Sequence, residues 1–136
     1  MRRVLFALIV ALIVPSSAMA SSVQVRTSAY GPVLFSGSGR ALYLFTADGT
    51  RRSTCYGACA RAWPPFYAKG PAVARGGARR GLLGTTRRRN GRRQVTYAGR
   101  PLYFYAGDPV GQIRCQNVFE FGGTWLVVSP DGSAVR

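Results

Sequence analysis

GRALYLFTAD (residues 39–48) and GRPLYFYAGD (residues 99–108) are the two stretches that decide the fold of this chain. They align without a gap at an offset of 60 residues, and glycine, arginine, leucine, tyrosine and aspartate are identical in both. The same offset places Cys55 on Cys115. Such a match predicts two copies of one supersecondary unit, which must pack together to bury a common core.

The first copy predicts a hairpin followed by the one short helix of the mature chain. Alternation of apolar and polar residues at 23–27 indicates a half-buried strand, and a turn at 37–39 leads to a second strand at 41–45. A helix is expected between Ser53 and Trp63, with Ser53 as its N-cap and a stop at Pro64-Pro65.

The second copy follows an aperiodic stretch at 68–80, rich in Gly, Ala, Pro and Arg, which predicts a flexible connection. Asn90-Gly91 predicts a hairpin between strands at 82–87 and 94–97, and further strands are expected at 102–105, 118–121 and 124–128. The sequence therefore predicts a mainly β fold: a small antiparallel β domain built from two tandem repeats, about 23–67 and about 81–132, with one short helix.

The first twenty residues predict export. Met1-Arg2-Arg3, an apolar run from Val4 to Val14 and the small-residue site Ala18-Met19-Ala20 have the order of a secretory signal peptide, cleaved after Ala20. The residue directly after the cleavage site is serine and not the cysteine of a bacterial lipoprotein, so no lipid anchor is expected. No segment of residues 21–136 has the roughly 20 apolar residues of a membrane span. We expect a single exported domain, periplasmic or secreted, of bacterial origin.

Positive charge is high, with a formal net charge of +15. Eight arginines lie between Arg75 and Arg93, and the candidates for anion binding are Arg87, Arg88, Arg89, Arg92 and Arg93. The run is either a solvated hairpin tip or a patch that attracts polyanions. For an exported protein those partners are anionic envelope components, or an envelope protein, and not nucleic acid.

The chain contains no histidine, which excludes a Ser-His-Asp triad, a Cys-His pair and an ordinary mixed zinc site. Its acids are Asp48, Asp108, Glu120 and Asp131, too few to nominate a catalytic residue. A non-enzymatic protein without a cofactor is expected.

The repeat motif has two interpretations. Tyr43 with Phe45, and Tyr103 with Tyr105, share one face of their strands, while Asp48 and Asp108 fall just beyond the strand ends. Each aspartate is suited to accept backbone N–H groups of the following turn, a structural role. Alternatively, both copies converge across a pseudo-twofold axis and form a polar pocket for a small ligand.

The two copies of Y-x-[FWY]-x-x-D, together with STCYGAC at 53–59 and AWPP at 62–65, resemble the bacterial secreted-repeat family of unknown function, also called predicted lipoproteins with the Yx(FWY)xxD motif. The resemblance continues through LYFY at 102–105 and WLVVSPDG at 125–132. It implies an exported envelope protein with paired repeats and no established reaction.

Cys55, Cys59 and Cys115 allow three single disulfides, and in an oxidising compartment one is expected. A bridge from Cys115 to Cys55 or Cys59 would join the repeats and is favoured over Cys55–Cys59, because it closes the longer loop. The alternative is thiol redox chemistry or capture of a soft metal such as Cu(I). Trp63-Pro64-Pro65 is expected to close the core and not to present a partner surface.

Overall fold

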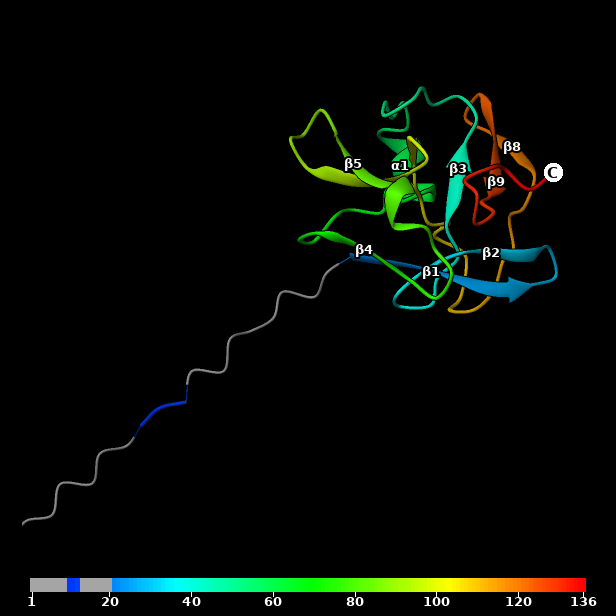
Figure 1. Ribbon diagram of the computed structural model, residues 1–136. Coiled ribbons are helices and arrows are strands. Elements are labelled where there is room, and N and C mark those ends of the chain that lie inside the picture. Colours follow the sequence, from blue (N-terminus) through cyan, green and yellow to red (C-terminus); the bar gives the residue numbers. More distant parts are fainter. Residues whose placement is uncertain (1–9, 13–20) are drawn as a thin grey trace, which may run out of the picture.

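The computed structural model describes residues 10–12 and 21–136 (Figure 1). The predicted signal peptide and its cleavage after Ala20 therefore lie almost wholly outside the described residues. Within the described part, no helix is long and apolar enough to cross a membrane. The elements are β1 (Ser21–Ser28), β2 (Gly31–Ser36), β3 (Tyr43–Phe45), α1 (Ala58–Ala62), β4 (Ala72–Arg75), the 3-10 helix η1 (Arg80–Leu82), β5 (Leu83–Arg87), β6 (Arg93–Tyr97), β7 (Arg100–Pro101), β8 (Val118–Glu120) and β9 (Gly123–Val127).

The fold is mainly β, as the sequence predicts, and comprises three small three-stranded sheets in the described chain. Their strand orders are β2-β1-β4, β3-β9-β8 and β5-β6-β7. All pairings are antiparallel except β1 with β4. In Figure 1 the β1–β2 hairpin runs beneath the other elements, with β3, β8 and β9 at one end and the β5 hairpin projecting at the other.

The two motif segments meet at their tyrosines. The first contains β3, but the strand predicted at 102–105 is wrong, because β7 ends at Pro101 and Tyr103 pairs only through isolated bridges. The backbone N–H groups of residues 102–104 bond in turn to Val95, Tyr43 and Pro64 and not to one neighbouring strand. Backbone N–H of Tyr43 donates to the carbonyl of Tyr103, and N–H of Tyr103 donates to the carbonyl of Tyr43, each at 2.9 Å. Such a reciprocal pair is the hydrogen-bonded pair of an antiparallel ladder, so the two tyrosine side chains point to the same face. The equivalent residues of the two repeats thus lie directly opposite one another.

Alternation of side chains along these two extended segments divides the core into two clusters. Tyr43, Phe45 and Tyr103 pack in one cluster with Trp63 and Trp125. The intervening leucines Leu42, Leu44 and Leu102 pack in the other, with Leu34 and Leu126. Both faces of β3 are buried, although it is the first strand in the order β3-β9-β8, and this explains why the sequence is apolar at every position from Ala41 to Phe45.

The predicted first hairpin is found only at its turn end. Phe35 bridges Ala41, but β3 then separates from β2 and pairs with β9, with Phe45 opposite Trp125. The prediction was incomplete because nearest-neighbour pairing along the chain competes with a long-range partner that covers more aromatic surface.

The helix is shorter than predicted, and Ser53 as its N-cap is wrong. α1 begins at Ala58 and has Gly57 in the N-cap position, without a side-chain cap. Ser53 lies several residues earlier, where its hydroxyl bonds with Tyr103 and accepts from Arg88. The helix does end before Pro64-Pro65, as expected.

The segment at 68–80, which the sequence predicts to be a flexible connection, contains a strand, β4. β4 pairs in parallel with the start of β1, from Ser21 opposite Ala72 to Gln24 opposite Arg75. Backbone hydrogen bonds along an open strand edge do not require a side-chain pattern, which is why composition missed this strand. The Asn90-Gly91 hairpin is confirmed, with β5 and β6 in register from Leu83–Tyr97 to Arg87–Arg93.

Candidate functional site

The tyrosine of each repeat binds the aspartate of the other. Tyr43 Oη donates to Asp108 Oδ2 at 2.5 Å, and Tyr103 Oη donates to Asp48 Oδ2 at 2.6 Å. Both tyrosines are fully buried, and Asp48 and Asp108 are 8% and 6% exposed. We call these four residues the crossed pairs. Their short O–H···O distances are those of hydrogen bonds to an ionised acceptor.

The second oxygen of each aspartate holds the loop that follows its own strand. Asp48 Oδ1 accepts from the backbone N–H and the hydroxyl of Thr54, both at 2.8 Å. Asp108 Oδ1 accepts from the backbone N–H of Arg114 at 2.9 Å. In both copies the donor stands six residues after the aspartate, so the two repeats build the same loop anchor. Each carboxylate therefore joins its own loop to the other repeat.

Burial controls the acid–base behaviour of the crossed pairs. Burial, followed by the hydrogen bond and the charge of Asp108, raises the pKa of Tyr43 far above its ordinary value of 10.0. Burial and the charge of Asp48 likewise raise the pKa of Tyr103. Burial also raises the pKa of Asp48, against the lowering effect of its bonds with Tyr103 and Thr54. Both phenols thus remain protonated donors at neutral pH.

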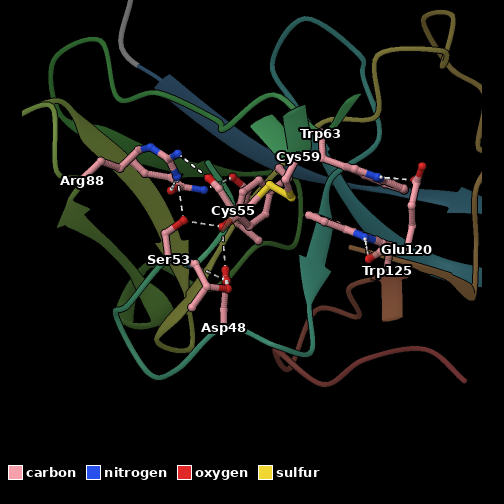
Figure 2. Close-up of a disulfide and its surroundings, with 12 residues drawn as sticks. Asp48, Ser53, Cys55, Cys59, Trp63, Arg88, Glu120 and Trp125 are labelled. Carbon is pink, nitrogen blue, oxygen red and sulfur yellow. Dashed lines mark hydrogen bonds between the residues drawn. A yellow bond between two sulfur atoms is a disulfide. The ribbon is translucent and has the colours of Figure 1, made fainter. Parts of the chain in front are cut away.

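The two copies differ in whether a second polar side chain contacts the tyrosine hydroxyl. Ser53 Oγ accepts from Arg88 Nη1 at 2.6 Å (Figure 2) and is 2.5 Å from Tyr103 Oη. A chain of polar groups therefore runs from Arg88 through Ser53 and Tyr103 to Asp48. At the offset of 60 residues, Ile113 stands where Ser53 stands in the first copy, and its side chain has no hydroxyl. The crossed pairs are therefore symmetric, whereas this polar chain belongs to one side only.

Arg88 is an interior residue, although the sequence placed it among surface arginines. It is 4% exposed; Nη1 also donates to Gln94 Oε1 at 2.9 Å, and Nη2 donates to the carbonyl of Cys55 at 2.5 Å. Its guanidinium also lies 4.3 Å from the ring centroid of Tyr56. No signal in the arginine run distinguishes it from Arg87 or Arg89, because hairpin geometry alone turns it inward.

The other four candidate anion-binding residues, Arg87, Arg89, Arg92 and Arg93, are exposed on the β5–β6 hairpin. Two of them lie over aromatic rings: Arg89 is 4.5 Å from the centroid of Tyr56, and Arg92 is 3.4 Å from that of Tyr67. Stacking of this kind holds a guanidinium in place while its outer edge remains open to solvent.

The disulfide joins Cys55 to Cys59, with Cα atoms 5.3 Å apart, so the favoured inter-repeat bridge is wrong. Gly57 has a positive φ of 57° between the two cysteines and turns the chain before α1 begins, which brings their side chains together. Cys115 is a half-buried free thiol. Burial raises the pKa of Cys115, and its hydrogen bond with Tyr105 raises the pKa of that phenol.

Trp63 belongs to the core and is fully buried. Its ring stacks on Trp125 with centroids 4.1 Å apart, and Trp125 stacks on Phe45 at 4.0 Å. Figure 2 shows both indole nitrogens directed at Glu120: Trp63 Nε1 donates to its carboxylate at 2.9 Å, and Trp125 Nε1 donates to its carbonyl at 3.1 Å. Glu120, which no sequence pattern singled out, therefore satisfies two buried donors.

In residues 10–12 and 21–136, no three His, Cys, Asp or Glu side chains are grouped so that they could hold a metal ion.

Comparison with known proteins identifies a family. A family model described as a secreted repeat of unknown function matches residues 24–67 and 84–129. One crossed-pair motif falls in each matched segment, at 43–48 and at 103–108. No curated protein and no solved structure matches the chain.

Proposed function

The chain belongs to a family of secreted repeats of unknown function, and from this premise we propose that it is an exported, non-catalytic domain of the cell envelope. In this proposal the motif residues lock the two repeats together, and the molecule acts through its outer surface as a structural or binding component. Export would proceed by cleavage after Ala20, into the periplasm or the medium.

The observation that carries this proposal is the burial of the crossed pairs. A catalytic acid, base or nucleophile must reach a substrate and must exchange a proton near the working pH. The two phenols and two carboxylates are less than a tenth exposed, and they are bonded to one another. The raised pKa of both tyrosines keeps them protonated at neutral pH, so neither phenol is available to accept a proton. The arrangement therefore favours a structural role for the crossed pairs, which hold the two repeats together, over an active site.

A double-mutant cycle on Tyr43 and Asp108 tests this structural role of the crossed pairs. We expect Tyr43→Phe and Asp108→Asn each to lower the free energy of unfolding by about 2–3 kcal/mol, because Phe removes the donor, and the one acceptor oxygen of Asn cannot satisfy both Tyr43 and the Arg114 N–H. The loss of unfolding free energy in the double variant should be smaller than the sum of the two single losses, since both changes affect the same Tyr43–Asp108 hydrogen bond. Denaturant unfolding of the exported protein measures all four forms.

Tyr30→Phe is the matched control, because Tyr30 is 43% exposed and outside the core. It should leave the unfolding midpoint unchanged. If Tyr43→Phe and Asp108→Asn were as stable as wild type, the crossed pairs would not hold the repeats together, and these groups would be available for another role.

A second candidate function is binding to anionic envelope material through Arg87, Arg89, Arg92 and Arg93. The exposure of these four side chains on one projecting hairpin supports it. Binding to immobilised lipopolysaccharide should weaken as salt rises and should fall further when the four residues are changed to Gln. A variant that neutralises Arg26, Arg61, Arg80 and Arg114, four exposed arginines elsewhere, has the same net charge and should retain the binding.

The thiol redox or soft-metal alternative receives less support. Cys55 and Cys59 are buried and already bonded to each other. Burial raises the pKa of the Cys115 thiol, which lowers the fraction present as the reactive thiolate.

A further inference from the structure

A cavity of about 660 Å³ opens beside the start of β1. Its walls come from Ser21 and Ser22 of β1, the turn that follows β2, and the segment from Pro65 to Lys69. Pockets of roughly 300–1,000 Å³ are typical of sites for small organic molecules. The cavity therefore has the volume for a single small ligand.

The charge on its walls has one sign. Four basic residues line the cavity, namely Arg40, Lys69, Arg75 and Arg92. The chain has only four acidic residues, Asp48, Asp108, Glu120 and Asp131, and none of them lines it. Nothing on the walls neutralises the positive potential, so the cavity concentrates anions.

Aromatic side chains form an apolar wall beside these charges. Phe66 and Phe104 pack against each other with ring centroids 5.1 Å apart, and Tyr67 adjoins them in the lining. Phe66 is 8% exposed and Phe104 is half-buried, so the wall is anchored in the core. A ring or short apolar chain can pack against such a surface.

Two of the cations are positioned on this wall in advance. The Arg40 guanidinium lies 4.6 Å from the ring centroid of Phe104, and its Nη2 donates to the carbonyl of Tyr105 at 2.9 Å. The Arg92 guanidinium lies 3.4 Å from the centroid of Tyr67. Side chains already held in place lose little freedom when an anion binds, which favours affinity.

We propose that this cavity binds one water-soluble organic anion, a molecule with a carboxylate, sulfonate or phosphate group joined to an apolar or aromatic ring. The acid group contacts the cations and the ring packs on Phe66 and Phe104. This goes beyond the role proposed above, because it assigns a site and a ligand class and does not depend on the crossed pairs. Of the four hairpin arginines considered above, the site uses only Arg92.

The test compares two fluorescent probes that differ in their charge. 8-Anilinonaphthalene-1-sulfonate carries an anionic group on an aromatic ring system, and N-phenyl-1-naphthylamine has the same rings without the sulfonate. Titrated into the exported protein, the anionic probe should saturate at one molecule per chain and bind about tenfold or more tightly than the neutral probe, since only it makes charge-assisted contacts.

Matched variants locate the site. Lys69→Gln with Arg75→Gln removes two exposed cations of the lining, and Arg61→Gln with Arg80→Gln removes two exposed cations elsewhere. The first pair should weaken binding of the anionic probe about tenfold, and the second should change it less than twofold, because exposed charges outside the site are screened. Phe104→Ala should weaken both probes, and a thermal melt checks that each variant is folded.

Equal affinity for the two probes, several probe molecules per chain, or equal weakening by both charge pairs would overturn the proposal. Vesicles of phosphatidylglycerol provide the last arm. If they sediment the protein through Lys69 and Arg75, and the control pair leaves sedimentation intact, the site recognises membrane lipid and the proposal of a soluble ligand is wrong. If the vesicles do not sediment the protein and do not displace the probe, a soluble anion is supported.

Discussion

At the residue scale, the repeated tyrosine and aspartate owe their importance to where their partners lie. Each carboxylate accepts from a phenol of the opposite repeat and from a backbone N–H of its own loop. A buried acceptor that loses its donor costs free energy because it has also lost water. Arg88 is a further buried polar residue, a cation whose guanidinium donates to Ser53, Gln94 and the Cys55 carbonyl.

The buried phenols predict a loss of stability at alkaline pH. The folded state holds the protons of Tyr43 and Tyr103 more tightly than the unfolded chain, whose tyrosines titrate near 10.0. Their contribution is fully present below pH 10 and is lost as pH rises towards the folded pKa, at about 1.4 kcal/mol per pH unit and per tyrosine. Urea unfolding between pH 8 and 11 measures this slope.

The double variant Tyr43→Phe, Tyr103→Phe should show a shallower slope over the same pH range, although it is less stable at pH 8. The same slope in both proteins would contradict the assignment of the alkaline transition to these residues.

The burial of Arg88 predicts that its substitution lowers the free energy of unfolding by a separate amount. Arg88→Met keeps much of the side-chain volume but leaves the acceptors on Ser53, Gln94 and Cys55 without their donor, so we expect a loss of about 2–4 kcal/mol. Arg87→Met, at the exposed neighbouring position, should change stability by less than about 0.5 kcal/mol. Denaturant unfolding compares the two, and equal effects would show that the buried network contributes nothing.

At the element scale, pairing between distant segments overrides local pattern. β3 pairs with β9 and not along its whole length with β2, and β4 forms from a stretch without periodicity because β1 offers it an open edge. The disulfide is an element-scale feature as well. It ties the loop before α1 to the helix and does not join the repeats.

The pairing predicts which cysteines affect stability. A bridge across so short a loop contributes about 2 kcal/mol in the chain-entropy model, less than a bridge between the repeats would contribute. Cys55→Ala with Cys59→Ala should therefore lower the free energy of unfolding by about this amount under non-reducing conditions. Cys115→Ala should lower it less.

Mass spectrometry of the non-reduced chain checks the pairing directly. Wild type and Cys115→Ala should both be two hydrogens lighter than their reduced forms. If the Cys115→Ala variant lacked this difference, the bridge would involve Cys115 instead.

At the scale of the whole molecule, neither repeat has a complete core. Tyr43 and Phe45 of the first repeat pack against Tyr103 and Trp125 of the second, and the crossed pairs run between the two. We therefore infer that the repeats are halves of one cooperative unit, since units of this size cannot bury their apolar faces alone.

This interdependence predicts the behaviour of fragments. Residues 21–80 and 81–136, made separately, should lack cooperative unfolding transitions, because β3 then loses both β9 and Tyr103. An equimolar mixture should regain the circular dichroism of the intact chain. A cooperative transition in residues 21–80 alone would show that the first repeat is an independent domain.

Local chemistry by itself determined the repeat, the mainly β class, the Asn-Gly hairpin and the strand face shared by Tyr43 and Phe45, because strand period and turn preference act over neighbouring residues. Only the tertiary structure decided which tyrosine meets which aspartate, which cysteines pair, that Arg88 points inward, and that four cations surround one cavity. These outcomes depend on contacts across 33 to 65 residues of chain, or on small local turns such as that at Gly57. Composition and spacing do not specify such geometry, since it follows from packing the two repeats into one core.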